Sequence, residues 1–281
     1  MPLATLVALA AALVLFAWLG VRARAVEGGV DDYVTARNTQ GARTLGLSFL
    51  ASGMGAWILF APPEVGAFVG PVAVIGYAVG AALPFLVLAV CGIGVRRYLP
   101  QGRSLGEFVG ARFGRGLYGW VTALSVLYML CFVTAELTAA GSITSLLSDL
   151  PAAVAVIGVA VTTLVYTAWG GLRASLVTDR WQALLLIGLL IVVGGVAMAS
   201  IDFSGDWRVA AAPTGDALSV AATLVIAVTA ANLFHQGYWQ RLWAAQSGTA
   251  LGRGALLGGG VTVLVVLAVG GLGVIARSTG L

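Results

Sequence analysis

The stretch LASGMGAWILFAPPEVG, residues 50–66, places two glycines, a proline pair and a carboxylate inside an otherwise apolar run. Gly53 and Gly55 weaken helical hydrogen bonding, and Pro62 and Pro63 lack the backbone N–H that a helix interior uses. Non-helical backbone persists inside a bilayer only where protein or water satisfies its polar groups, and transporters use such breaks to form ion sites near the membrane midplane. The stretch therefore predicts a broken spanning helix with a binding site at the break, although a merely kinked helix also fits.

A second interruption is predicted in AANLFHQGYWQR, residues 230–241, where Asn232, His235, Gln236 and Gly237 follow an apolar run. Two broken spans in corresponding positions of two repeats mark the binding site of many transporters. Five spans separate the starts of the two interrupted segments, as a five-plus-five repeat requires. The simpler alternative is that His235 and Gln236 form a helix-end pair satisfied by neighbouring backbone.

Three carboxylates also stand in or beside the apolar runs. Glu136 lies in the middle of one, where a charge is costly unless it is paired, hydrated or protonated, so we expect a functional or structural polar partner. Asp179 follows Thr178 at the predicted start of another span, and the simpler role for it is an N-terminal cap. Glu64 follows the first break and is expected near the outer mouth of the site, unless it is only a helix-end charge.

Composition places these residues in an integral membrane protein. Apolar residues make up 60% of the chain and charged residues 9%, and the mean hydropathy is +1.00. A span needs about 20 apolar residues. We predict an all-α helical bundle with eight such runs, at about 3–21, 44–69, 71–95, 117–147, 152–169, 176–200, 217–237 and 254–276.

The basic residues predict the orientation of this bundle. All fifteen are arginines, and thirteen follow the odd-numbered spans. Only Arg208 and Arg277 fall in the opposite loops, so the positive-inside rule places the N-terminus outside a cell membrane. The arginines are divided among four loops instead of forming one basic face, which argues against nucleic-acid binding.

Catalysis and a structural metal are not expected. The two cysteines, Cys91 and Cys131, fall in apolar runs and are predicted to be buried thiols outside any disulfide framework. One histidine and two separated cysteines do not assemble a clustered metal site. A Ser/His/Asp arrangement built on His235 is compatible with the spacing, but no nucleophile motif accompanies it. We therefore predict a protein that is not an enzyme and carries no cofactor.

Three segments carry a resemblance to a known family, and they are ASGMGAW (51–57), YTAWGGLRASLVTDRWQ (166–182) and FHQGYWQRLWAAQS (234–247). They resemble the sodium:solute symporter family, over about residues 31–281. The resemblance implies a LeuT-type inverted-repeat fold preceded by one extra helix, and inward movement of a small polar solute together with sodium as the coupling ion. It also implies a division into an extra helix and cytoplasmic loop (1–43), a first five-helix repeat (44–200) and the start of a second repeat (201–281).

The resemblance further implies roles for individual residues. The backbone carbonyls of Ala51 and Met54 match sodium ligands of the family, and Asp179 matches an aspartate on the sodium exit route. An acidic residue of the proline-transporting branch is replaced by Gly53, so proline is a less expected solute, and LFAPPEVGAFVG (59–70) resembles the urea and polyamine branch. The residues implied to contact solute are Gly53, Gly55, Trp57, Asn232, His235 and Gln236, and those implied in coupling or gating are Glu64, Glu136 and Asp179.

The family fold carries about thirteen spans, whereas eight are predicted here. The resemblance therefore implies that these 281 residues hold the N-terminal part of a transporter and do not complete coupled uptake alone. Two other readings stay open, a symporter-like sensor module of a signalling protein and a fragment without ligand. The expected partners are a solute, sodium and membrane lipid, with solute identity and oligomeric state left open.

Overall fold

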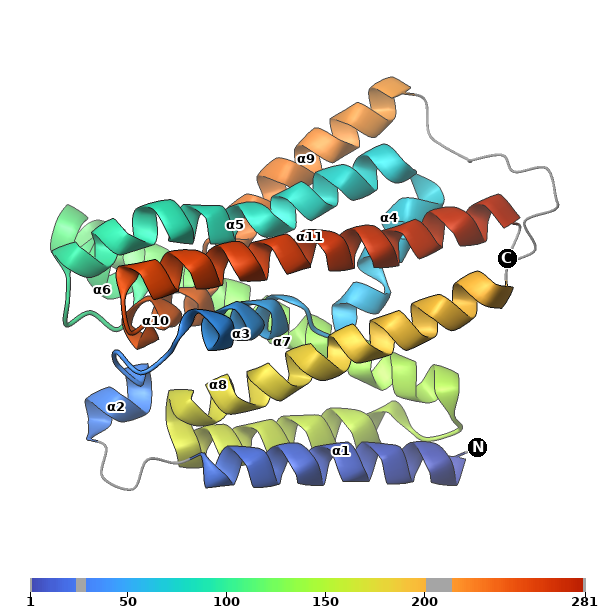
Figure 1. The fold of residues 1–281 in the computed structure, drawn as a ribbon, viewed down its shortest axis with the longest axis horizontal. Helices are drawn as coiled ribbons and strands as arrows, with labels where there is room; N and C mark the ends of the chain where they lie inside the picture. Colours follow the sequence, from blue (N-terminus) through green and yellow to red (C-terminus); the bar gives the residue numbers. More distant parts are fainter. Residues whose placement is uncertain (1, 24–28, 201–213, 280–281) are drawn as a thin grey trace.

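The computed structural model describes residues 2–23, 29–200 and 214–279, nearly all of them helical (Figure 1). Long apolar runs form the helices, and glycines, prolines and polar residues stand at their ends. In chain order the elements are α1 (Pro2–Arg22), α2 (Val30–Thr35), α3 (Ala42–Gly53), the 3-10 helix η1 (Ala56–Leu59), α4 (Ala61–Phe68), α5 (Pro71–Tyr98), α6 (Leu105–Phe113), α7 (Arg115–Leu147), α8 (Ala152–Ser200), α9 (Thr214–Asn232), α10 (Gln236–Ala244) and α11 (Gly248–Thr279).

The predicted multi-pass membrane bundle is confirmed. In the described part of the chain six helices are long and apolar enough to cross a membrane, and the bent pair of α3 with η1 and α4 forms a seventh span. α8 counts once in that number although it holds 49 residues, far more than one crossing needs. Its backbone leaves the helical region at Gly171, where φ is 60° and ψ is −150°. The chain folds back there (Figure 1), so α8 supplies two crossings, and the described residues together supply the eight that we predicted.

The chain reversal in α8 requires glycine at position 171 for two reasons. Its positive φ is a conformation that residues with a side chain rarely adopt. A Cβ at this position would also collide with the carbonyl oxygen of Tyr33 in α2. The Tyr33 hydroxyl donates to the Ala168 carbonyl at 2.9 Å, so α2 is fastened across the fold.

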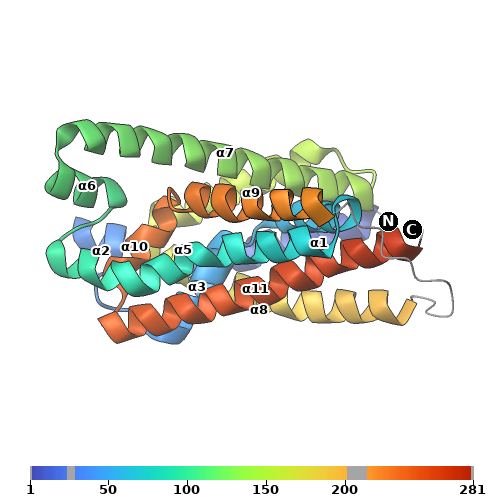
Figure 2. The same cartoon turned by 90° about the horizontal axis from the view of Figure 1, so that it is seen from above.

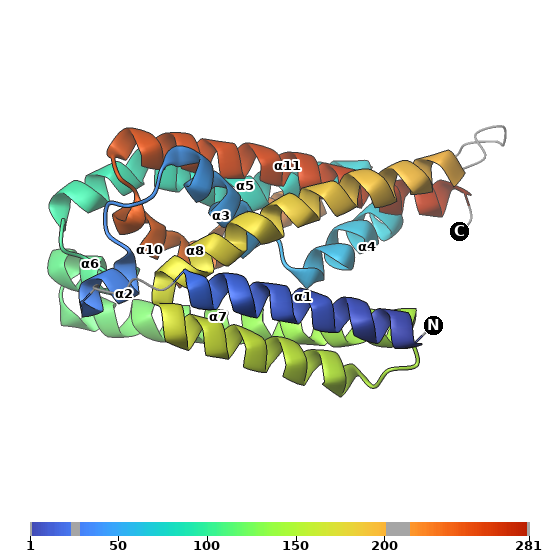
Figure 3. The ribbon, with the colours of Figure 1, turned by 60° about the horizontal axis from the view of Figure 1, so that its bottom comes forward.

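The C-terminal ends of α1, α5, the first half of α8 and α10 lie at one end of the bundle, which we call the arginine end (Figures 1 and 3). Asp31 pairs there with Arg37 at 2.7 Å and with Arg103 at 3.3 Å. The hydrogen bond from Arg37 is the main reason that the pKa of Asp31 falls to about 2. Asp32 pairs with Arg173 at 2.7 Å. Arg24 and Arg208, two of the arginines used to predict orientation, lie outside the described residues.

α11 runs along α3, α4 and α5 and fixes their relative positions (Figure 2). Small residues permit this close approach, since a side chain at Gly66 would meet the backbone of Gly270, and one at Gly273 would meet the backbone of Pro63. Such small-residue contacts are the usual way in which spanning helices pack. The two halves of the first broken span are therefore held against one long helix.

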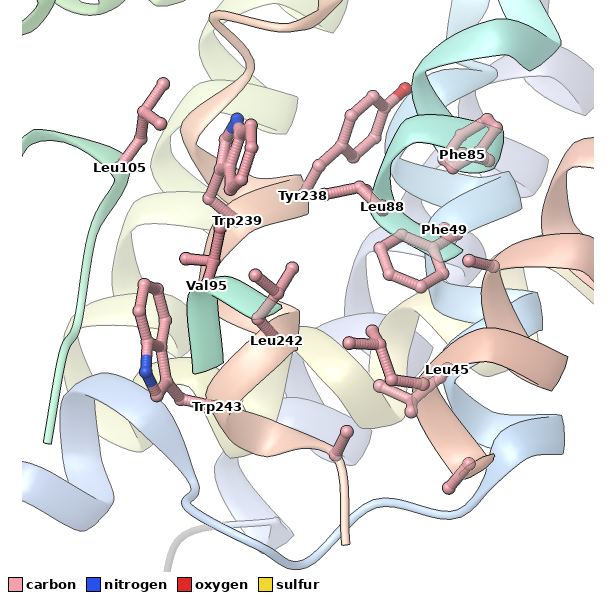
Figure 4. Close-up of a cluster of buried hydrophobic side chains, with 14 of the residues drawn as sticks. Leu45, Phe49, Phe85, Leu88, Val95, Leu105, Tyr238, Trp239, Leu242 and Trp243 are labelled. Atoms are coloured by element: carbon pink, nitrogen blue, oxygen red, sulfur yellow. The ribbon is translucent and has the colours of Figure 1, made fainter. Parts of the chain in front are cut away.

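A cluster of buried apolar side chains fills the space between α3, α5, α10 and α11 (Figure 4). Phe49 of α3 and Phe85 of α5 lie 5.5 Å apart between ring centroids, and both rings face Tyr238 of α10. Trp243 is 1% exposed and its indole N–H donates to the Leu99 carbonyl at 2.8 Å. The cluster anchors α10, and with it the C-terminal side of the second predicted break.

Two sequence expectations were wrong. Cys91 and Cys131 remain free thiols, but both are exposed on the outer faces of α5 and α7, because an apolar helix in a membrane places hydrophobic residues on its lipid side as well as in the core. The sixth span begins at Leu172, directly after the fold at Gly171, and not near residue 176.

Candidate functional site

The first predicted break is confirmed. α3 ends at Gly53, Met54 and Gly55 are non-helical, and the helix axes on either side of them differ by 63°. Pro62 and Pro63 do not make the break, because they lie in the first turn of α4, where a missing N–H costs little. The glycine-containing turn alone interrupts the span.

The unwound turn frees backbone carbonyls of the kind that sodium needs. The Leu50 carbonyl accepts from Met54 N at 2.9 Å, and the Gly55 carbonyl accepts from Ile58 N at 3.2 Å. Within the described residues, no backbone amide outside the helix donates to the carbonyl of Ala51 or Met54. Both lie at the C-terminal end of α3, where a helix leaves its last carbonyls without partners. Their assignment as sodium ligands stays a prediction.

Glu136 of α7 reaches the first break. Its Oε2 accepts from the backbone N–H of Ala56 at 2.6 Å, at the start of η1. Its Oε1 is buried and has no hydrogen-bond partner among the described residues. A Cβ at Gly55 would occupy the same space as this carboxylate. Gly55 therefore serves to admit Glu136, and Glu136 caps the unwound turn.

Gly53 has the matching relationship with the second broken span. A Cβ at Gly53 would collide with the hydroxyl of Tyr238 in α10. Tyr238 is 2% exposed and packs on Phe85 with 4.8 Å between ring centroids (Figure 4). The last turn of α3 thus rests on a ring supplied by the other break.

The second predicted break is also confirmed. α9 ends at Asn232 and α10 begins at Gln236, with three non-helical residues between them. The Trp239 indole N–H donates to the Leu233 carbonyl at 2.7 Å and so satisfies part of the exposed backbone. His235 is 4% exposed, stacks on Tyr238 at 4.2 Å between centroids, and leaves its Nδ1 without a partner in the described chain.

One face of α7 joins the two breaks. Tyr128, Phe132 and Glu136 follow one another at four-residue spacing and so lie on one helical stripe. The Tyr128 hydroxyl donates to Asn232 Oδ1 at 2.9 Å, and Phe132 meets His235 edge to face at 5.1 Å. Sequence reasoning identified Glu136 but missed Tyr128 and Phe132, although their spacing from Glu136 was a readable signal.

Of the remaining predicted site residues, Trp57 and Gln236 lie in the elements that adjoin the breaks, whereas Glu64 does not reach them. Trp57 lies in η1, stacks on Tyr77 at 5.9 Å between centroids, and has a buried indole N–H with no described partner. Gln236 begins α10, half-buried, and no side-chain hydrogen bond of it is found within the described residues. Glu64 is exposed in the first turn of α4, and the structure does not bring it to the two breaks.

Asp179 is not a helix cap. It lies seven residues after Leu172, inside the second half of α8, and its Oδ2 accepts from Arg241 Nη2 at 2.5 Å and from Ser48 Oγ at 2.5 Å. Arg241 is 2% exposed and also donates from Nε to Ser48 at 2.7 Å. The pair therefore ties α3, α8 and α10 together near both breaks. Sequence reasoning missed Arg241, because it treated this arginine only as a loop charge.

Two broken helices held face to face by a third helix define the LeuT-like class of membrane transporter. A solved structure of this class, a Na+-coupled sialic acid symporter in a substrate-bound outward-open state, matches with a TM-score of 0.78 and 17% sequence identity. The match covers 97% of this chain and 61% of that one. At this low sequence identity it shows that the two proteins share a fold.

The sequence profile of the sodium:solute symporter family matches residues 33–276, and the chain belongs to that family. It is also 29% identical over 253 residues to the spermidine transporter DUR31 of Candida albicans (strain SC5314 / ATCC MYA-2876). That similarity covers 89% of this chain and 48% of the relative. The chain thus spans about half the length of the curated relative that it matches.

Proposed function

We propose that the protein carries a small polar solute inward across the cell membrane together with sodium. The observation that carries this proposal is the pairing of two broken spans across the Tyr128, Phe132 and Glu136 stripe of α7. Discontinuous helices of this kind provide backbone groups for a coupling ion and side chains for a solute. In this proposal residues 44–200 form the first repeat, residues 201–281 begin the second, and the arginine end faces the cytoplasm with the N-terminus outside.

Sodium is proposed to bind at the carbonyls of Ala51 and Met54. A hard cation is held by oxygen ligands, and an unwound turn offers carbonyl oxygens without a buried formal charge. Asp179 then stands close to the sodium route, because it accepts a hydrogen bond from Ser48 of the same helix α3. Its pairing with Arg241 supports a role in which ion passage and the position of α10 depend on each other.

The solute is proposed to lie between the breaks, against Trp57, His235 and the α7 stripe. Trp57 Nε1 and His235 Nδ1 are buried without described partners, and a polar solute would satisfy such atoms. The relative DUR31 is a spermidine transporter. A nitrogen-rich solute is therefore the first class to test, ahead of sugars and acids.

The test is uptake into proteoliposomes that contain the purified full-length gene product. Labelled spermidine, urea, proline and sialic acid are offered with an inward sodium gradient or with choline in its place. We expect accumulation of one solute class in sodium and none in choline, with loss of accumulation when the sodium gradient is collapsed. Equal uptake in sodium and choline would overturn sodium coupling, and binding without any accumulation would favour a sensor.

A further inference from the structure

Glu136 carries an acceptor atom that the fold does not use. Its Oε2 accepts the Ala56 N–H at 2.6 Å, whereas Oε1 is buried and has no partner among the described residues. The other buried carboxylate near the breaks, Asp179, is paired with Arg241. Around the two breaks, Glu136 is thus the carboxylate whose charge is left without a described counter-charge.

An unpaired carboxylate oxygen at membrane depth is expensive, so its retention needs a reason. Leaving a buried acceptor unsatisfied costs about 1–3 kcal/mol, and more when the group is charged. A cap on the Ala56 N–H needs only one oxygen, which a neutral side chain would also supply. Gly55 keeps the space for the whole carboxylate open. The geometry therefore holds a second oxygen available for something that the chain does not provide.

The surroundings of this oxygen suit an organic cation better than sodium. Trp57 is one residue beyond the capped Ala56 and stacks on Tyr77, and Phe132 lies one turn before Glu136 on the same stripe. Aromatic faces attract ammonium groups, most strongly in sites removed from water. Sodium instead needs a shell of several hard oxygens, and the protein groups identified around the Glu136 carboxylate are the backbone N–H groups of Ala56 and Trp57.

We propose that Glu136 is the anionic contact for an ammonium group of the transported solute, bound at the first break beside Trp57. This inference rests on the proposed function and adds the charge class of its solute. One end of the solute lies at Glu136, and the other extends along the α7 stripe past Phe132 toward His235. A linear amine would present one of its ammonium groups to the carboxylate and apolar methylene groups to the rings along this stripe.

The test measures equilibrium binding of labelled spermidine to the purified protein in sodium, with unlabelled putrescine and fully acetylated, uncharged spermidine as competitors. The variants are Glu136→Gln, which keeps an oxygen for the Ala56 N–H but removes the charge, and Glu136→Asp, which keeps the charge on a shorter side chain. Glu107→Gln is the matched control, since Glu107 is an exposed carboxylate of α6. Sodium-dependent amide protection of residues 51–58 is recorded in each protein as an independent readout.

We expect Glu136→Gln to weaken spermidine binding at least about tenfold, as loss of a charged hydrogen-bond partner does. Glu136→Asp should retain part of the affinity, Glu107→Gln all of it, and sodium protection should persist in every variant. Wild-type affinity in Glu136→Gln overturns the proposal. Loss of sodium protection in that variant also overturns it and assigns Glu136 to the cation site of sodium instead.

Competition binding to the wild-type protein tests the ammonium site a second time, without any substitution. Displacement of spermidine by putrescine but not by the uncharged acetylated compound supports an ammonium site, and equal displacement by both overturns it. If the full-length gene product binds no amine yet accumulates urea or proline with sodium, the ammonium site is wrong while the proposed function stands. If sodium neither protects residues 51–58 nor drives any uptake, the proposed function itself fails.

Discussion

The Glu136 carboxylate occupies the space into which a side chain at Gly55 would extend. Gly55 has φ −96° and ψ −162°, an extended conformation that any residue adopts. The absence of a side chain at this position therefore reflects packing and not backbone strain. The same carboxylate caps Ala56, so the shape of the unwound turn and the position of α7 depend on each other.

We predict that Gly55→Ala is destabilising because its methyl group displaces the carboxylate. Overpacking of this kind costs about 1–3 kcal/mol. The double variant Gly55→Ala with Glu136→Ala should recover most of the lost thermal stability, although not the solute binding. Gly94→Ala in α5 is the control, since nothing lies within 4 Å of a Cβ there. No recovery in the double variant would show that the two residues do not compete for space.

Asp179 and Arg241 should behave as one unit in stability. Removing either partner leaves a buried charge unpaired, which costs about 3–5 kcal/mol. We expect Asp179→Asn and Arg241→Met each to lower thermal stability strongly, and the double variant to be more stable than the sum of the two predicts. A double-mutant cycle on the purified protein measures this coupling.

A second double-mutant cycle on the exposed pair of Asp31 and Arg103 serves as the reference. Its side chains are 40% and 47% exposed, and exposed pairs contribute about 0–1 kcal/mol. Additive effects at Asp179 and Arg241, like those expected of the exposed pair, would contradict the buried network.

His235 combines ring packing with an unpartnered polar atom, and two variants separate these roles. His235→Phe keeps a ring against Tyr238 and Phe132 but loses Nδ1, whereas His235→Ala loses both. If Nδ1 contacts the solute, both variants should weaken solute affinity while sodium protection of residues 51–58 persists. Full affinity in His235→Phe would return His235 to a packing role.

The docking of α2 should depend on pH through Asp31. The pKa of Asp31 is lowered from 3.8 to about 2 in the folded state, chiefly by Arg37, so its contribution is complete above pH 4 and declines as the pH falls toward 2. Amide exchange of residues 30–35, corrected for intrinsic rates, should be slow at pH 6 and faster at pH 2.5. Asp31→Asn should show the faster exchange already at pH 6, and a pH-independent difference between the two proteins would contradict this.

The sequence was sufficient to predict both breaks and all eight crossings, because glycine and polar residues inside apolar runs have few explanations in a bilayer. It correctly placed Gly53 and Gly55 at the first break but wrongly gave Pro62 and Pro63 a part in it, since they begin α4 and the unwound turn lies before them. Of the two roles open for Asp179, the structure excludes the helix cap. The partner of Asp179 stands 62 residues later in α10, and such a contact is decided by tertiary packing and not by local pattern.

The partners of Gly53 and Gly55 could not be predicted from the local sequence either. Gly53 and Gly55 were expected at the site because they weaken a helix, and they do lie at the break. Their specific partners, Tyr238 and Glu136, come from other helices, so local sequence did not reveal that each glycine makes room for one side chain. Tyr128 and Phe132 escaped notice because aromatic residues in an apolar run are usually packing.

The most direct test of the central claim is hydrogen exchange of residues 51–58 in the wild-type protein, with sodium or choline as the cation. We expect slower exchange in sodium at Met54 and Gly55, because coordination by the Ala51 and Met54 carbonyls would order the unwound turn. Peptides from α5 serve as the internal reference and should not change. Identical exchange in sodium and choline, at sodium concentrations up to those of the extracellular medium, would contradict a sodium site at this turn.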